Sequence, residues 1–243
     1  MDADERALLD AIIAEPDEDT PRLVYADWLD EHGRHERAEL IRAQIGLIRS
    51  KDEDTTAQRN AWQARVRVLL CAHSEGWRKE LPKIPRVRWG PFERGMVESV
   101  TLKLRYWTPA VPSDLVNLFA HVPLRALRAH FARWDGNSPE DCVGLLSWPG
   151  LERFDELHLI ARFHARPGED VISPFLAPLW THSWADRPRV IDLRECDLRD
   201  AAVQPLMAGP LHRLPTLVFA QRSFSESTRA VLTARLGHGV RFV

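Results

Sequence analysis

Apolar residues in the first ninety positions recur at helical spacing, in runs separated by polar or proline-containing breaks. The first run places Leu8, Leu9, Ile12 and Ile13 on one face, as an amphipathic helix requires. Pro16 and the acidic residues after it end this run. The same pattern then repeats, and it predicts four helices over residues 3–14, 20–33, 34–50 and 57–80.

The limits of the second helix are marked by residues with known end preferences. Thr20 is predicted to cap its start by accepting a hydrogen bond from a free backbone amide, and Pro21 suits the first helical position. Gly33 suits the left-handed conformation that commonly ends a helix. The first ninety residues are therefore expected to form a small helical domain.

Beyond this domain the pattern changes to short strands that alternate with helices. Leucine-rich repeats follow the pattern L-x-x-L-x-L-x-x-N/C-x-L, in which alternate apolar residues of a short strand point inward. Copies of this pattern start at positions 97, 124, 154, 188 and 214, and a truncated last strand covers Val240–Phe242. The inward pairs are Val100/Leu102, Leu127/Ala129, Leu157/Leu159, Ile191/Leu193 and Leu217/Phe219.

Each predicted strand is followed by a segment with helix-start signals. Helices are expected to begin at Ser113, Ser138, Ser173, Asp200 and Ser225, and Gly237 is expected to end the last one. The predicted fold is therefore α/β: a helical domain over residues 1–90, followed over 91–243 by a short, irregular leucine-rich-repeat solenoid with parallel strands and outer helices.

The repeats depart from the regular pattern in their turns. The ninth position is occupied by Arg105, Ala132, Arg162, Cys196 and Arg222 in the five copies, where regular repeats have asparagine or cysteine. The third interval is long, and residues 164–170 are predicted to form an inserted loop. The solenoid is therefore expected to be degenerate.

Part of the helical domain also carries a distinctive motif. The run DTPRLVYADWLDEHG over residues 19–33, followed by RAELIRAQ over 37–44, resembles a bacterial repeat-companion domain, and RGMVESV over 94–100 resembles its link into repeats. Such domains occur mainly in planctomycetes and myxobacteria, commonly beside leucine-rich repeats. The resemblance covers about residues 5–50. It implies an architecture and an interaction role, and no catalytic residues.

Composition and charge narrow the function classes. Hydrophobic residues make up 44% and charged residues 28% of the chain, which is typical of a globular protein. The net charge of −2 conceals a block at 1–54 with a net charge of −9 and a block at 55–90 with a net charge of +6. These blocks either pair internally or form a binding surface. Nucleic-acid binding through the basic residues of 59–88 is not favoured, because no nucleic-acid-binding motif accompanies them.

The expected location is the cytoplasm. No stretch approaches the roughly 18 apolar residues of a membrane helix, and the acidic start, MDADERALLD, is unlike a secretory signal. The three cysteines, Cys71, Cys142 and Cys196, are far apart and have no metal-binding spacing. They are expected to be reduced thiols.

The helical domain offers one candidate cluster. Asp27, Glu31, His32 and His35 are types that bind metals, but their spacing matches no metal signature, and a solvated acidic face is the favoured interpretation. Ion pairs across the helix hairpin are also expected, from Arg37, Glu39 and Arg42 on one side to Asp27, Asp30 and Glu31 on the other.

The main candidate site is the concave face of the repeats, the usual binding surface of solenoids. In the predicted register this face includes Thr101, Lys103, Arg128, His130, Glu156, His158, Asp192, Arg194 and Val218. The favoured hypothesis is a non-catalytic adaptor that binds a protein partner through this face and the helical domain, with no cofactor.

The alternative is a metal-dependent hydrolase built on His130, His158 and Asp192. A third hypothesis is nucleic-acid contact through the basic segment. The familiar nucleophile, nucleotide-binding and zinc-helix motifs do not occur in the sequence.

Overall fold

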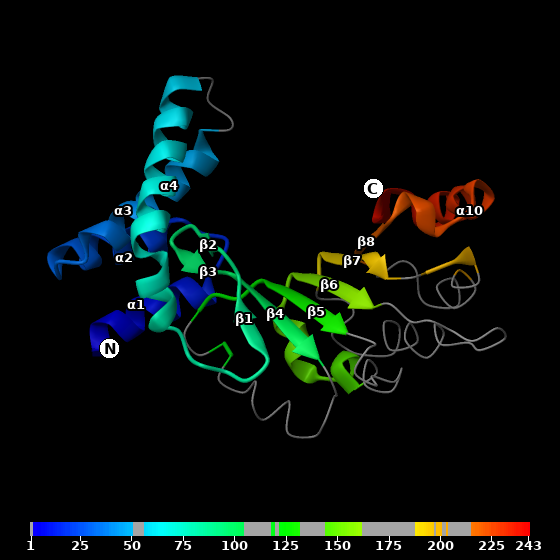
Figure 1. Cartoon of the computed structure of the whole chain (residues 1–243), viewed down its shortest axis with the longest axis horizontal. Helices are drawn as coiled ribbons and strands as arrows, with labels where there is room; N and C mark the ends of the chain where they lie inside the picture. The colour runs from blue at the N-terminus through cyan, green and yellow to red at the C-terminus, as the bar shows by residue number, and fades with distance from the viewer. Residues whose placement is uncertain are drawn as a thin grey trace. The chain divides into compact units, whose positions relative to one another are not determined.

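The computed structural model describes residues 2–50, 56–104, 118–119, 122–131, 144–161, 188–196, 198–200, 203 and 215–243. It divides into two compact units (Figure 1). Unit 1 comprises 1–84, 89–99 and 116–124, and unit 2 comprises 85–88, 100–115 and 125–243. The units therefore interleave along the chain, instead of meeting at a single boundary after residue 90.

Unit 1 contains the four predicted helices. They are α1 (Ala3–Ala14), α2 (Thr20–Glu31), α3 (His35–Arg49) and α4 (Thr56–Lys79). The side chain of Asp2 caps α1 by accepting a hydrogen bond of 2.7 Å from the backbone N–H of Glu5. The predicted limits of the four helices agree with the structure to within two residues.

The start of α2 differs from the predicted cap. Thr20 is the first helical residue, and the capping position is Asp19, whose side chain makes no capping hydrogen bond. Pro21 still lies in the first turn. Gly33 has a φ of 73° directly after the helix, so the predicted left-handed end is confirmed.

The core of unit 1 joins the inner faces of the first three helices. It contains Leu9, Ile12, Tyr25, Ala26, Leu29, Ala38, Ile41, Ile45 and Met96. The apolar residues Val24 of α2 and Ile48 of α3 are exposed instead, at 48% and 45%. On α4 only Leu69 is buried. The apolar pattern thus identified the helices but overstated how much of each is buried.

A small hairpin within unit 1 was not predicted. It pairs β2 (Phe92–Glu93) with β3 (Met96–Val97) in antiparallel fashion. The side-chain amide of Gln44 donates to the Phe92 carbonyl and accepts from the Gly95 N–H, both at 2.7 Å. These two bonds hold the hairpin against α3.

Unit 2 is built on a mostly parallel sheet, so the chain is a mixed α/β protein. In order across the sheet, the strands are β1 (Val87–Trp89), β4 (Ser99–Leu104), β5 (Ala126–Phe131), β6 (Glu156–Ala161), β7 (Val190–Cys196), β8 (Thr216–Phe219) and β9 (Val240–Phe242). The pairs from β5 to β9 are parallel. Figure 1 shows β4 to β8 lying side by side in chain order. The strand β1, at one edge, was not predicted.

One row of inward apolar residues runs across the five parallel strands. Leu127, Leu157, Ile191, Leu217 and Val240 lie opposite one another in successive pairs, and each is at most 9% exposed. All ten residues of the predicted inward pairs are buried. The strands and their inward faces are therefore confirmed.

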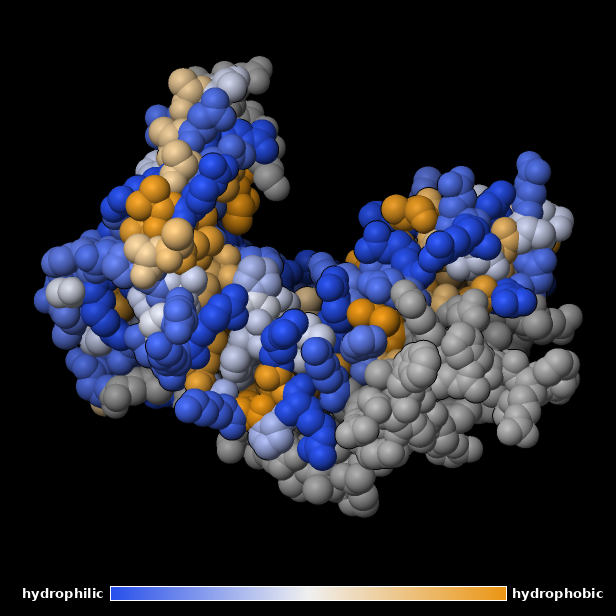
Figure 2. Space-filling view, viewed as in Figure 1, coloured by the Kyte–Doolittle hydropathy of each residue, from blue (hydrophilic) through white to orange (hydrophobic). Residues whose placement is uncertain are grey.

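Two of the predicted helix signals can be compared with the structure at the C-terminal end. Ser225 caps α10 (Glu226–Leu236) through its hydroxyl, and Gly237, with a φ of 54°, follows the last residue. Leu232 is the buried residue of this helix, and its surface in Figure 2 is largely hydrophilic. Among the described residues there are also three short 3-10 segments, Pro149–Arg153, Gln221–Ser223 and Gly237–Gly239.

Several predicted features lie outside the described residues. They are the turn positions Arg105, Ala132 and Arg162, the loop 164–170, the helix starts at Ser113, Ser138 and Ser173, and Cys142.

Candidate functional site

The parallel register aligns four of the predicted partner-binding residues in one row. Arg128 of β5 lies opposite His158 of β6, His158 lies opposite Asp192 of β7, and Asp192 lies opposite Val218 of β8. Their alternation with the buried row places them on the other face of the sheet. Arg128 is exposed, His158 is half-buried, and Asp192 and Val218 are buried.

The remaining predicted residues lie around this row. Glu156 and Arg194 precede and follow it on β6 and β7. His130 lies opposite Ile160, two positions beyond the row. Thr101 and Lys103 lie on β4, which neighbours β5 in the sheet.

Asp192 is the centre of a polar network. Its carboxylate accepts hydrogen bonds from Arg194: 2.6 Å from Nη2, 3.0 Å from Nε and 3.0 Å from the backbone N–H. On the neighbouring strand, Nδ1 of His158 lies 3.1 Å from the second oxygen of Asp192. These donors satisfy a carboxylate that is only 7% exposed.

The charge state of Asp192 follows from these contacts. Burial alone would raise the pKa of this carboxyl, but hydrogen bonds from the side chain and backbone of Arg194 outweigh burial and leave the pKa below its usual value. Asp192 also raises the pKa of Arg194. The pair is therefore an ion pair at neutral pH.

A β-bulge supports this arrangement. The register of β6 with β7 shifts between His158 and Ile160, so that Ile160 lies opposite Glu195. Two consecutive residues of β7, Arg194 and Glu195, are exposed as a result. Cys196 is buried again, and its thiol donates to the carbonyl of Leu159 in β6 at 3.2 Å.

The network gives the metal-hydrolase hypothesis no support. No group of three or more His, Cys, Asp or Glu side chains could hold a metal ion among the described residues. The carboxylate of Asp192 is occupied by Arg194. His130 lies diagonal to His158 rather than opposite it, so the register does not assemble the proposed His-His-Asp group.

The candidate cluster on the helical domain is an ion-pair network. Arg42 bonds to Asp27 at 2.7 Å and to Asp30 at 2.5 Å, and His35 lies 3.1 Å from Asp30. The predicted pairing of Arg42 across the helix hairpin is therefore confirmed. Arg37, for which pairing was also predicted, makes no such ion pair with a described residue and instead lies over the rings of Trp77 and Phe92.

Some basic residues of the 59–88 segment contact their own unit. Arg65 forms a bidentate pair with Glu39, which joins the acidic and basic blocks, and Lys79 pairs with Glu75. Arg78 donates to the Trp89 carbonyl. These contacts reduce the charge that the segment would offer to a nucleic acid.

Arg241 also belongs to the sheet face but was not predicted from the sequence. Arg241 of β9 lies opposite Val218, at the end of the same row, and is exposed. The signal was present, because Val240–Phe242 was predicted as a strand, and the residue between two inward positions of a strand points to the other face.

No protein-family model, curated protein or solved structure matches this chain. Among the helices that the structure describes, none combines the length and apolarity needed to cross a membrane.

Proposed function

We propose that this chain is a non-catalytic adaptor that binds a protein partner through the open face of the unit 2 sheet. We further propose that unit 2 is an irregular leucine-rich-repeat solenoid and that unit 1 is a repeat-companion domain. The observation that carries the proposal is the single row from Arg128 to Arg241 across five parallel strands.

The proposed face has the properties of a specific polar recognition surface. Arg128, Arg194 and Arg241 are exposed cations on three strands, and Glu156 and Glu195 are exposed acids between them. Asp192 fixes Arg194 by a fork of hydrogen bonds, so less side-chain entropy is lost when that arginine binds an acidic group. Mixed charges of this kind favour a partner with a complementary pattern.

The repeat interpretation is supported by the row of inward apolar residues and by Cys196, which occupies the ninth position of its copy. Regular repeats bring successive strands together without a shift in register, as Leu127, Leu157 and Ile191 are aligned here. The proposed location is the cytoplasm, in keeping with the reduced thiols of Cys71 and Cys196.

The test is a charge reversal on the sheet face. Tagged wild-type chain, the double variant R128E/R194E and the control R235E, on the exposed side of α10, are compared in affinity purification from the native host. The proposal requires a stoichiometric protein partner that is retained by R235E and lost from R128E/R194E. Equal recovery by both variants would exclude the sheet face as the binding site.

A further inference from the structure

One guanidinium nitrogen of Arg37, in unit 1, is buried without a hydrogen-bond acceptor among the described residues. Arg37 extends from α3 to two aromatic rings, with its guanidinium carbon 4.9 Å from the centroid of Trp77 and 4.5 Å from that of Phe92. The two rings meet edge to face with centroids 5.8 Å apart. The guanidinium therefore lies in an aromatic corner, where cation–π attraction holds it.

The donors of this guanidinium are not matched by acceptors. Nη1 of Arg37 is buried and has no hydrogen-bond partner in the part of the chain that the structure describes. Burial lowers the pKa of Arg37 to about 10, so the group is still charged at neutral pH. Rings attract the cation through its faces, whereas its N–H groups require acceptors in its plane. Burying such a cation raises the free energy of the folded state unless an anion pairs with it.

The neighbouring Arg34, in contrast, has an anionic partner. Arg34 bonds to the Glu5 carboxylate at 2.5 Å, and the Tyr25 hydroxyl donates to the same oxygen at 3.0 Å. Burial, followed by the charge of Glu5, raises the pKa of Tyr25. Glu5 therefore already pairs with Arg34 and accepts from Tyr25. Among the described residues, no carboxylate forms an ion pair of this kind with Arg37.

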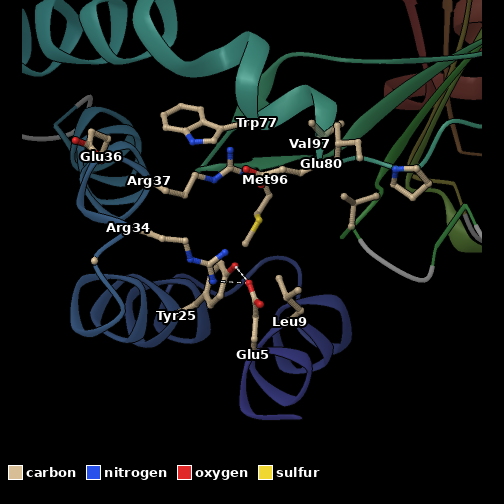
Figure 3. A pocket seen from close by; sticks show the side chains of 14 residues that line it. Glu5, Leu9, Tyr25, Arg34, Glu36, Arg37, Trp77, Glu80, Met96 and Val97 are labelled. Atoms are coloured by element: carbon tan, nitrogen blue, oxygen red, sulfur yellow. Dashed lines mark hydrogen bonds and ion pairs between the residues drawn. The ribbon is translucent and has the colours of Figure 1, made fainter. Parts of the chain in front are cut away.

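Both arginines line one cleft of about 630 Å³, a size that suits small ligands. All its lining residues belong to unit 1. Figure 3 shows Arg37 and Trp77 pointing toward each other, with Met96 beside them and the Glu5–Tyr25–Arg34 cluster across the cleft. Leu9, Leu81 and Val97 add apolar surface. The cleft therefore contains one cation that forms no ion pair with a described residue, beside apolar side chains.

We propose that this cleft binds a monocarboxylate carried on a compact apolar group. The carboxylate pairs with the charged guanidinium of Arg37 where this side chain lines the cleft, and the apolar group packs on Trp77 and Met96. A dianion such as phosphate is disfavoured, because Glu36 and Glu80 also line the cleft and only one arginine is left to offset its second charge.

The carboxylate has two possible sources, a free organic acid or the C-terminus of a peptide with an apolar last residue. Isothermal titration of the full chain with 4-phenylbutyrate and with N-acetyl-Ala-Leu, each beside its amide, separates them. At least one acid should bind at one site per chain, and its amide should bind at least about tenfold more weakly, because it has lost the charge that Arg37 requires. Binding of only one acid identifies the source. Failure of both, or equal binding of acid and amide, overturns the proposal.

Variants assign the binding to Arg37. R37M keeps the length of the side chain and removes its charge, and affinity for the acid should fall at least about tenfold. The control is R78M, because Arg78 also lies over Phe92, at 5.3 Å, but does not line the cleft. Affinity unchanged in R37M would overturn the assignment, and the acid–amide comparison on the wild-type chain tests the proposal however the variants fold.

Discussion

The guanidinium of Arg22 lies 2.9 Å from the carboxylate of Glu98, and neither side chain is more than 7% exposed. Arg94 shares this carboxylate at 3.0 Å and also donates to the carbonyls of Pro16 and Asp17. The ion pair joins residues 19–33 to residues 94–100, two segments that are far apart in the sequence. One buried carboxylate thus pairs with two buried arginines and fixes the β2–β3 hairpin to the start of α2.

Replacing Glu98 with glutamine should strongly destabilise unit 1. The variant removes the carboxylate that pairs with the buried guanidinium groups of Arg22 and Arg94, and Arg94 keeps only the more distant carboxylate of Asp19, at 3.8 Å. Breaking a buried pair costs about 3–5 kcal/mol. Chemical denaturation followed by far-ultraviolet circular dichroism measures the loss. The control is E39Q, which removes the pair with Arg65, where both side chains are more than 40% exposed, and which should cost about 1 kcal/mol or less. Equal losses of stability in E98Q and E39Q would show that the buried ion pair contributes no more than the exposed one.

Two glycines with the same backbone conformation should respond differently to alanine. Gly33 has a φ of 73° and no atom within 4 Å of an added Cβ, so G33A costs only backbone strain, about 1–2 kcal/mol. Gly95 has a φ of 78°, and its Cβ would lie 2.0 Å from Cγ1 of Ile41. G95A should therefore cost about 3 kcal/mol or more, because overpacking adds to the strain. Thermal unfolding of both variants checks the difference, and similar melting temperatures would contradict the close packing of the hairpin on α3.

The contribution of Asp192 to stability should depend on pH. Its folded-state pKa is lowered, so the stabilisation is present above the unfolded value of about 3.9 and is lost as pH falls through the lower folded value. The melting temperature of D192N should therefore lie well below that of the wild type at pH 6, and the gap should narrow below about pH 4. E195Q, which alters an exposed acid of the same strand, is the control. A gap that stays constant down to pH 3 would mean that the Asp192 charge is not involved.

The periodic elements were predictable because each is defined by local pattern. Helices of unit 1 follow from apolar spacing, and β4 to β9 follow from pairs such as Leu157 and Leu159, since a strand's inward residues must alternate. Most residues of the sheet face were predictable with these strands, because Arg128, His158 and Asp192 occupy equivalent positions of successive strands. They are aligned because the strands are in register up to His158, where the shift between β6 and β7 begins.

Features that depend on contacts between distant segments were not predictable. The hairpin β2–β3 is too short to show an alternating pattern, and it is held by Gln44 of α3. Nor does the sequence distinguish Arg37 from Arg42, which are one and a half turns apart on the same helix. Arg42 faces Asp27 and Asp30, whereas Arg37 faces Trp77 and Phe92, and only the packing of α4 and the hairpin decides this.

The row of inward apolar residues across the parallel strands of unit 2 should be sensitive to the loss of one side chain. Leu157 is fully buried between Leu127 and Ile191 on the neighbouring strands. L157A removes apolar contacts on both sides and leaves a cavity, which should cost about 2–5 kcal/mol. V231A, at a position of α10 that is 49% exposed, is the control and should change stability by about 0.5 kcal/mol or less. Amide hydrogen exchange of wild type and L157A locates the effect: protection should fall along β5, β6 and β7 together, because each strand stabilises the next. Loss of protection confined to β6 would contradict a continuous ladder.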